Sequence, residues 1–297
     1  MPELPEVEVA MKGIKAAFEG ATLAQLQLGP YGLRRPFDPR TRQLRGQRLG
    51  RVRRLAKYIL LDFEDPQPKS PGGEGAGWSL ALHLGMSGRA LVTTTDSALG
   101  RHDHVVLDFT LPQGGQGRLV VTDPRRFGAL DLLQRPVEGH PPFNALGPDP
   151  LEPGFTKAAL AVACKGRRAP IKNLLLDQKA VVGLGNIYVC EALFRAAIHP
   201  AQPACTLRPS QLAKLHAVIP PLLRQAVAAG GSTLRDHAGT DGRPGAFQQL
   251  HQVYGREGQP CVLGGAPHGT IKRMVQAGRS TFHCPTCQPP GTWEAGT

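Results

Sequence analysis

The sequence has few cysteines and lacks long apolar stretches. Six cysteines in 297 residues are too few for a disulfide scaffold, and three of them gather near the C-terminus, which points toward a metal. No apolar run approaches the roughly 18 to 20 residues that span a bilayer, and the N-terminus lacks the basic leader of a signal peptide. We therefore expect a cytoplasmic protein without a membrane segment.

Acidic residues are scarce in the second half of the chain. The whole chain has 35 basic and 23 acidic residues, a net charge of +12. Residues 155–297 hold 16 of the basic and 6 of the acidic residues, which leaves 16 − 6 = +10 in that half. A charge excess of this kind favours an acidic polymer as partner, and nucleic acid is the first candidate.

Apolar spacing divides the chain into a β-rich first part and a helical second part. Apolar side chains from Val7 to Phe18 repeat at a helical period, and from Arg51 to Gln134 apolar and polar residues alternate as in the short strands of a sandwich or barrel. Residues 136–154 contain six prolines, which is typical of a linker. Helical spacing follows, and the last forty residues, with turn glycines and paired cysteines, predict a small hairpin.

The first residues offer a nucleophile. Initiator methionine is normally removed before a small residue, which would leave Pro2 with a free secondary amine. Such an amine can attack an aldehyde-like carbon and form an iminium, and the adjacent carboxylate of Glu3 could transfer protons. Taken alone, the same residues could simply lead into the first helix.

Three segments place cations or bulky apolar side chains at the ends of expected strands. A basic run with ten positive residues between positions 34 and 57 ends at Lys57, which could face a phosphate or a proton transfer, or could be part of a solvated surface. The segments HLGMSG, RHDH and DPRRFG follow, at residues 83–88, 101–104 and 123–128. A methionine and a phenylalanine beside arginines suit insertion between bases, although Met86 alone would more simply be a core residue.

Two motifs in the second half concern phosphate and metal. Gly183-Leu184-Gly185-Asn186 precedes an expected helix from Ile187, and Asn186 as its N-cap would help to form a phosphate site, although a plain helix junction explains the motif equally well. Near the C-terminus, Cys284 and Cys287 form half of a zinc motif. Cys261 supplies a third thiol, but position 264 is glycine, and His268 is a candidate for the fourth ligand.

Together these motifs resemble the formamidopyrimidine-DNA glycosylase and endonuclease VIII family of base-excision repair enzymes. The resemblance covers nearly the whole chain: PELPEVE at the start, Ala56-Lys57-Tyr58, HLGMSG, DPRRFG, GLGNIY, VYGR at residues 253–256 and the terminal finger. It implies an α+β fold: a catalytic β-sandwich domain with its leading helix over residues 1–135, a linker over 136–154, a helix-two-turn-helix domain over 155–250 and a zinc-finger-like hairpin over 251–290. Leu4 and the intact Arg125-Arg126-Phe127 favour the formamidopyrimidine branch.

The resemblance also implies roles for individual residues. Pro2 would attack C1′ of a flipped-out oxidised purine nucleotide, with Glu3 as its acid/base partner. Lys57 and Arg279 would be the proton donors for β- and δ-elimination. Met86, Arg125 and Phe127 would fill the gap left by the base. Residues 232–247 would form the loop that covers the flipped base. The other DNA contacts would be His83, His102, Arg167, Lys172 and Asn186, and the zinc ligands Cys261, Cys284 and Cys287.

This reading predicts a monomeric enzyme, associated with the nucleoid, that acts on damaged double-stranded DNA and holds one zinc per chain. Gly264 puts the metal in doubt but not the chemistry. Two alternatives stay open: endonuclease VIII-like specificity for oxidised pyrimidines, and a non-catalytic zinc-containing DNA-binding protein. The second alternative gives no reason for Pro2 and Glu3 at the processed terminus.

Overall fold

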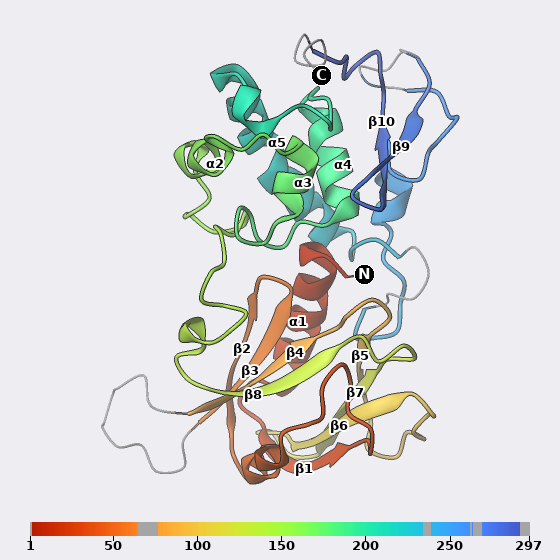
Figure 1. The fold of residues 1–297 in the computed structure, drawn as a ribbon. Helices are drawn as coiled ribbons and strands as arrows, with labels where there is room; N and C mark the ends of the chain where they lie inside the picture. The colour runs from red at the N-terminus through yellow and green to blue at the C-terminus, as the bar shows by residue number, and fades with distance from the viewer. Residues whose placement is uncertain (1, 65–76, 234–238, 262, 264–268, 292–297) are drawn as a thin grey trace. The chain divides into compact units, whose positions relative to one another are not determined.

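A computed structural model describes residues 2–64, 77–233, 239–261, 263 and 269–291. The chain forms two compact units, the first made of Met1–Ala145 and Ala229–Ala246 and the second of Leu146–Ala228 and Phe247–Thr297 (Figure 1). None of the helices in the described ranges is long and apolar enough to cross a membrane.

Two antiparallel four-stranded sheets form the first unit. One sheet has the order β1 (Thr22–Leu28), β6 (Asp103–Thr110), β7 (Gln116–Thr122), β5 (Arg89–Thr93), and the other β2 (Leu49–Leu55), β3 (Tyr58–Phe63), β4 (Trp78–His83), β8 (Ala129–Gln134). A short 3-10 helix, η1 (Pro39–Leu44), lies between β1 and β2, and a second one, η2 (Val137–Gly139), follows β8. The expected β-sandwich is confirmed, and its strands are buried on both faces in β3 and β4.

Helix α1 (Leu4–Phe18) packs against strands of both sheets and completes their core. Its helical repeat buries Val7, Ile14 and Phe18 to 1% exposure or less, as the sequence predicts. The ring of Phe18 stacks on Phe109 of β6 at 4.7 Å between centroids. Each such side chain contributes about 1.5 to 3 kcal/mol through burial, so α1 is a structural part of the sandwich.

The segment Ala229–Ala246 belongs to the first unit, whereas the sequence analysis placed it in the helical domain. The backbone N–H of Ser232 donates to Glu6 of α1 at 2.7 Å, and the carbonyl of Thr240 accepts from Val92 of β5 at 2.8 Å. Gly13 of α1 gives Thr240 its space, because a Cβ there would overlap the threonine side chain. Two hydrogen bonds between residues distant in sequence therefore override the local pattern.

The second unit contains the expected helices and hairpin. Its elements are α2 (Lys157–Cys164), α3 (Ile171–Leu176), α4 (Asn186–Arg195), η3 (Ala204–Thr206), α5 (Pro209–Ala228), η4 (Phe247–Leu250), β9 (Lys272–Gln276) and β10 (Arg279–His283). Strands β9 and β10 are joined by Ala277 and Gly278, both with positive φ, as a two-residue hairpin turn requires. The α+β fold class is confirmed.

A buried carboxylate attaches the segment before the hairpin to α4. Glu191 is fully buried, and its Oε1 accepts backbone N–H bonds from Gln252, Val253 and Tyr254 at 2.9 to 3.0 Å. An ionised acceptor with several N–H donors forms strong hydrogen bonds in a dry site. This single side chain therefore fixes the path of the chain toward the hairpin.

We predict that Glu191→Gln lowers the free energy of unfolding by about 2 kcal/mol, because the amide loses the negative charge and turns an NH₂ group toward N–H donors. Urea denaturation measures the change. Glu152→Gln, at an exposed position of the same unit, serves as the control and should change stability by less than about 0.5 kcal/mol. Equal effects of the two substitutions would contradict a stabilising role for the hydrogen bonds that Glu191 accepts.

Candidate active site and nucleic-acid interface

The N-terminus is fixed at the start of α1 by two carboxylates. Glu3 is the N-cap residue and is 3% exposed, and its backbone N–H donates to Glu6 Oε2 at 2.8 Å. The Glu3 side chain accepts from the backbone of Glu6 in return, which completes a capping box. Pro2 is buried directly before this cap. The predicted nucleophile and its predicted acid/base partner therefore have a defined backbone geometry.

Lys57 lies in the two-residue connection between β2 and β3. The preceding residue, Ala56, has a φ of 53°, a left-handed conformation that is uncommon outside glycine. Lys57 is 7% exposed, so its long side chain does not extend into solvent as a surface lysine usually does. Strand β2 packs against α1, which places the turn in the same unit as Pro2 and Glu3.

Asp123 joins the two loops that carry the predicted gap-filling side chains. Its carboxylate is 1% exposed and accepts from the Ser87 hydroxyl at 2.6 Å and from the Gly128 N–H at 2.8 Å. Gly85 has a φ of 64°, and a Cβ at this position would come within 2.5 Å of Gly128 N. The loops at 84–88 and 123–128 are therefore in backbone contact and rigidly paired.

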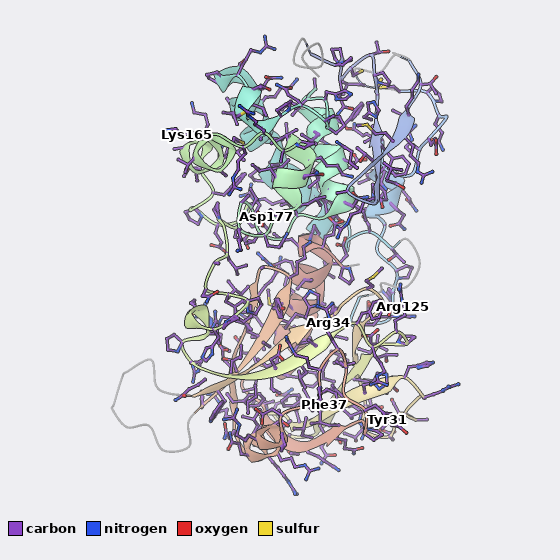
Figure 2. The ribbon with its side chains drawn as sticks, in the orientation of Figure 1. Tyr31, Arg34, Phe37, Arg125, Lys165 and Asp177 are labelled. Atoms are coloured by element: carbon purple, nitrogen blue, oxygen red, sulfur yellow. The ribbon has the colours of Figure 1, made fainter. Side chains whose placement is uncertain are left out.

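The side chains on these paired loops point outward. Met86 is 44% exposed and Phe127 is 41% exposed, so the alternative of Met86 as a core residue is wrong. The Arg125 guanidinium lies over the Phe127 ring, with Cζ 4.6 Å from the centroid. Arg34, which Figure 2 labels together with Arg125, lies on a neighbouring loop and donates its backbone N–H to the Gly128 carbonyl. Exposed apolar groups on a rigid, basic support suit insertion into a base stack.

His83 is neutral in the folded protein. Burial lowers its pKa to about 4, and the positive charges of Arg34 and Lys57 act in the same direction. Its Nδ1 accepts the backbone N–H of Gly85 at 3.0 Å, which leaves the proton on Nε2 as a hydrogen-bond donor. His102 is half-buried, and its carbonyl accepts the backbone N–H of Asp123 at 3.0 Å.

In the second unit, three predicted site residues converge on the hairpin. Arg279 begins β10 and is exposed. The next residue, Ser280, has a carbonyl that accepts from Asn186 Nδ2 at 2.8 Å and from Lys172 Nζ at 3.2 Å. The Lys172 ammonium also donates to the Thr281 hydroxyl at 2.6 Å, and burial lowers the pKa of this fully buried lysine. Both side chains hold the strand that presents Arg279.

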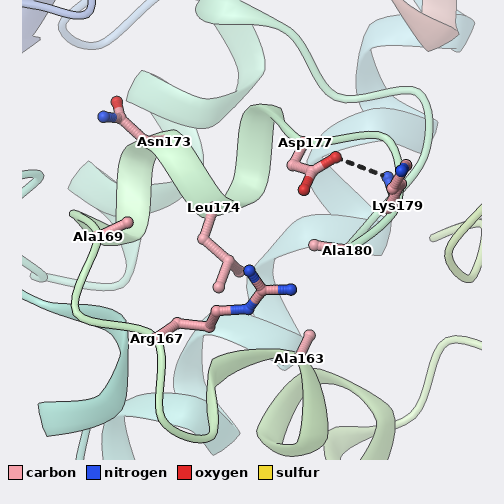
Figure 3. Close-up of a pocket in the computed structure, with 8 residues that line it drawn as sticks. All are labelled: Ala163, Arg167, Ala169, Asn173, Leu174, Asp177, Lys179 and Ala180. Carbon is pink, nitrogen blue, oxygen red and sulfur yellow. Dashed lines mark hydrogen bonds between the residues drawn. The ribbon is translucent and has the colours of Figure 1, made fainter.

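Two details of this region differ from the sequence analysis. Helix α4 begins at Asn186 itself with Gly185 as N-cap, so the prediction of Asn186 as N-cap is wrong, and its side chain contacts the hairpin instead. Arg167 lies apart from the hairpin contacts described above. It lines a cavity of about 180 Å³ with Leu174 and Asp177, whose carboxylate accepts from the Lys179 N–H (Figure 3).

Three thiols form a candidate metal site at the base of the hairpin. The Sγ atoms of Cys261, Cys284 and Cys287 all lie within 4.8 Å of one another, with Cys261 and Cys287 at 3.6 Å. Three thiols at this separation fit three corners of a zinc tetrahedron. The positions of Gly264 and His268 lie outside the described residues, and the described part of the chain supplies no fourth ligand to the cluster.

Comparison with known proteins defines the class of this architecture. Residues 1–130 match the model of the formamidopyrimidine-DNA glycosylase N-terminal domain, and residues 146–238 match the model of the formamidopyrimidine-DNA glycosylase H2TH domain. The chain thus has the two domains of a helix-two-turn-helix DNA glycosylase.

Individual relatives are similar to this protein over almost the whole chain. The formamidopyrimidine-DNA glycosylase of Gluconobacter oxydans is 49% identical and that of Cereibacter sphaeroides 47% identical, each over 97% of this chain and 100% of the relative. The crystal structure of MutM (Fpg) from Thermus thermophilus has a TM-score of 0.80 at 37% identity, over 98% of this chain and 100% of that one. The Lactococcus lactis Fpg in complex with abasic-site DNA has a TM-score of 0.83 at 30% identity, over 97% and 100%. The chain belongs to the formamidopyrimidine-DNA glycosylase family.

Sequence reasoning missed two residues that organise the site. Glu6 ties Glu3 to Ser232, and the spacing of a carboxylate three residues after another at a helix start is the signal that could have identified it. Asp123 begins the DPRRFG motif, but the sequence analysis assigned it no function. An aspartate at the start of a turn often accepts hydrogen bonds from the backbone of that turn, as Asp123 does from Gly128. Both act through the backbone of distant segments.

We predict an acid-dependent loss of stability from His83. Its folded pKa of about 4 lies below its ordinary value of 6.5, so the unfolded chain binds the proton first as the pH falls. The contribution of neutral His83 to the free energy of unfolding is fully present above about pH 6.5 and is completely lost below about pH 4. Between pH 7 and 5 the residue should account for about 2 kcal/mol.

Urea unfolding at the two pH values measures this effect in the wild type and in His83→Gln, which keeps an acceptor for Gly85 but does not titrate. Because burial also lowers the pKa of His199, His251 and His283, both proteins should lose stability in acid. The difference between them isolates His83. Identical losses would show that His83 titrates normally.

Proposed function

We propose that the protein is a bifunctional DNA glycosylase and abasic-site lyase that excises 8-oxoguanine and formamidopyrimidines from duplex DNA. The observation that carries this proposal is the N-terminus: Pro2 and Glu3 are buried and fixed at the start of α1 in a chain of the formamidopyrimidine-DNA glycosylase family. A purely DNA-binding member would have no need for this arrangement. We also propose that it acts as a monomer on damaged DNA at the nucleoid.

In the proposed reaction, the Pro2 nitrogen attacks C1′ of the damaged nucleotide. The N–C1′ bond forms as the C1′–N9 bond to the base breaks, and loss of the amine proton and ring opening of the sugar give an iminium. Glu3 transfers protons at the sugar and the amine. Lys57 donates the proton for β-elimination and Arg279 the proton for δ-elimination, so that the strand is cut on both sides of the sugar.

The exposed loop side chains support base extrusion. Flipping a nucleotide costs a few kcal/mol of stacking and pairing. Met86 and Phe127 would occupy the vacated space, with Arg125 facing the orphaned cytosine. Their rigid support through Asp123 favours this role, because a wedge that moved freely would lose its contacts on insertion.

Cationic and polar side chains of both units would contact phosphates. In the second unit Arg279 is exposed on the hairpin, and Arg167 is exposed beyond α2. Fully buried Lys172 would support Arg279 through Ser280, and half-buried Asn186 would do the same and contribute a phosphate contact of its own. His83, through Nε2–H, and His102 are the proposed contacts of the first unit.

The decisive test is borohydride trapping on a duplex that contains 8-oxoguanine opposite cytosine. The wild type should form a covalent adduct that peptide mapping locates on Pro2. Pro2→Gly should reduce trapping strongly, and Glu3→Gln should slow base release about 100-fold or more with little change in DNA affinity. An adduct on a lysine of the wild-type enzyme would overturn the assignment of the nucleophile.

The same assay separates the two alternatives. Faster excision of thymine glycol than of 8-oxoguanine would indicate endonuclease VIII-like specificity. Binding to damaged duplex without any cleavage or adduct would indicate a non-catalytic DNA-binding protein.

We further propose that Cys261, Cys284 and Cys287 hold one zinc ion with His268 as the fourth ligand. The grouping of three thiols supports the site. Burial opposes the thiolate of Cys284, but hydrogen bonds from the Cys287 backbone and the Cys261 thiol lower its pKa, whereas burial raises the pKa of Cys287 to about 12. Cys284 is therefore the thiol of this cluster that most readily supplies a thiolate ligand. The ion would be structural and would stabilise the base of the hairpin.

We predict about one zinc per chain in protein purified without chelators. Elemental analysis should show loss of the metal in Cys284→Ser and weaker binding in His268→Ala. Cys205→Ser is the control, because Cys205 is exposed and lies outside the three-thiol cluster. Metal-free protein with full activity would show that the hairpin needs no ion.

A further inference from the structure

The guanidinium of Arg54 connects helix α1 to the turn that carries Lys57. Arg54 Nε donates to Glu8 Oε2 of α1 at 2.7 Å, and Arg54 Nη1 donates to the carbonyl oxygen of Ala56 at 3.0 Å. The Arg54 side chain is 5% exposed and that of Glu8 is 15% exposed, so this ion pair is shielded from water and poorly screened by salt. One planar group thus contacts a helix and a strand turn at once.

The bond to Ala56 fixes the peptide unit through which the chain enters Lys57. The carbonyl of Ala56 belongs to the peptide unit that joins it to Lys57, and this unit is planar. Fixing the oxygen therefore fixes the direction in which the chain enters Lys57. Ala56 is left-handed, a conformation that an alanine adopts only when its surroundings enforce it. The two-residue turn between the paired residues Leu55 and Tyr58 calls for this conformation, and the hydrogen bond from Arg54 supports it.

The bond to Glu8 attaches the turn to the helix that begins at the N-terminus. Glu8 lies on α1, whose first turn is capped by Glu3 and directly follows Pro2. Helix α1 is rigid over this distance because its apolar face is buried in the sandwich core. The position of the Lys57 turn is therefore set relative to the same helix that holds the N-terminus.

We propose that Arg54 is a positioning residue for the lyase reaction: it holds Lys57 in register with Pro2 and Glu3. This inference rests on the proposed function, in which Lys57 donates a proton during elimination. A misplacement of a reacting group by about 1 Å can cost about 100-fold in rate. Arg54 touches neither DNA nor the reacting atoms in this proposal, and it acts through the geometry of Ala56 and Lys57.

Strand β2 provides a matched control. The neighbouring residue, Arg53, pairs with Asp62 at 2.8 Å and with Glu138 at 3.2 Å, and it has no hydrogen bond to the turn among the described residues. Arg53→Ala therefore removes a half-buried ion pair from the same strand and leaves the Lys57 turn in place. It measures the cost of losing an arginine for structural reasons alone.

The experiment compares Arg54→Ala, Arg54→Lys and Arg53→Ala in single-turnover cleavage of abasic-site duplex. Affinity for a duplex with a tetrahydrofuran abasic analogue and thermal melting are measured in parallel. We expect Arg54→Ala to slow elimination about 100-fold with less than about threefold change in affinity. Arg54→Lys, which cannot bond both partners in a fixed fork, should be similarly slow. Arg53→Ala should react at close to the wild-type rate.

Adding Ala56→Gly to Arg54→Ala separates positioning from stability. Glycine adopts the left-handed conformation without steric cost but does not restore the bond that holds the peptide unit, so the double variant should regain melting temperature without regaining the elimination rate. Recovery of the rate together with the melting temperature, or an equal loss in Arg53→Ala, would overturn the inference. If the wild type itself formed no trapped adduct, the proposed function would fail; if it did and Arg54→Ala kept the wild-type rate, only the positioning role would fail.

Discussion

The carboxylate of Glu6 is the interaction on which the N-terminal end of the first unit depends. One oxygen accepts the N–H of Glu3 and the other accepts the N–H of Ser232, two segments more than two hundred residues apart in the sequence. The residue is 2% exposed, so loss of either bond would leave a buried charge only partly solvated. The helix cap and the attachment of residues 229–246 are therefore energetically linked.

Buried carboxylates accept backbone hydrogen bonds in the same way at two other places. Asp123 accepts from both loops that carry Met86 and Phe127, and Glu191 accepts from the segment that leads to the hairpin. In each case a buried carboxylate satisfies backbone donors of an irregular segment that no helix or sheet would otherwise satisfy. The loops at 84–88 and 123–128 are thus held by side-chain hydrogen bonds, while Met86 and Phe127 themselves remain exposed.

Local sequence patterns predicted the elements but not these connections. The repeat from Val7 to Phe18 identified α1, because burial of one helix face leaves a periodic record in the sequence. The membership of residues 229–246 in the first unit depends on single hydrogen bonds to α1 and β5, which leave no period. For the same reason Asn186 was expected to cap α4, whereas its amide binds the Ser280 carbonyl of a strand ninety-four residues away.

Long-range bonds of the same kind hold the hairpin from outside the segment that contains position 264. Strand β10 is held by Lys172 and Asn186, and the Gln288 side chain both accepts from Cys284 N and donates to the carbonyl of Ile198. Each of these contacts is made by residues outside the 261–268 segment. A zinc ion would strengthen the base of the hairpin, but Ser280 and Thr281, which follow Arg279, already attach the strand to α3 and α4.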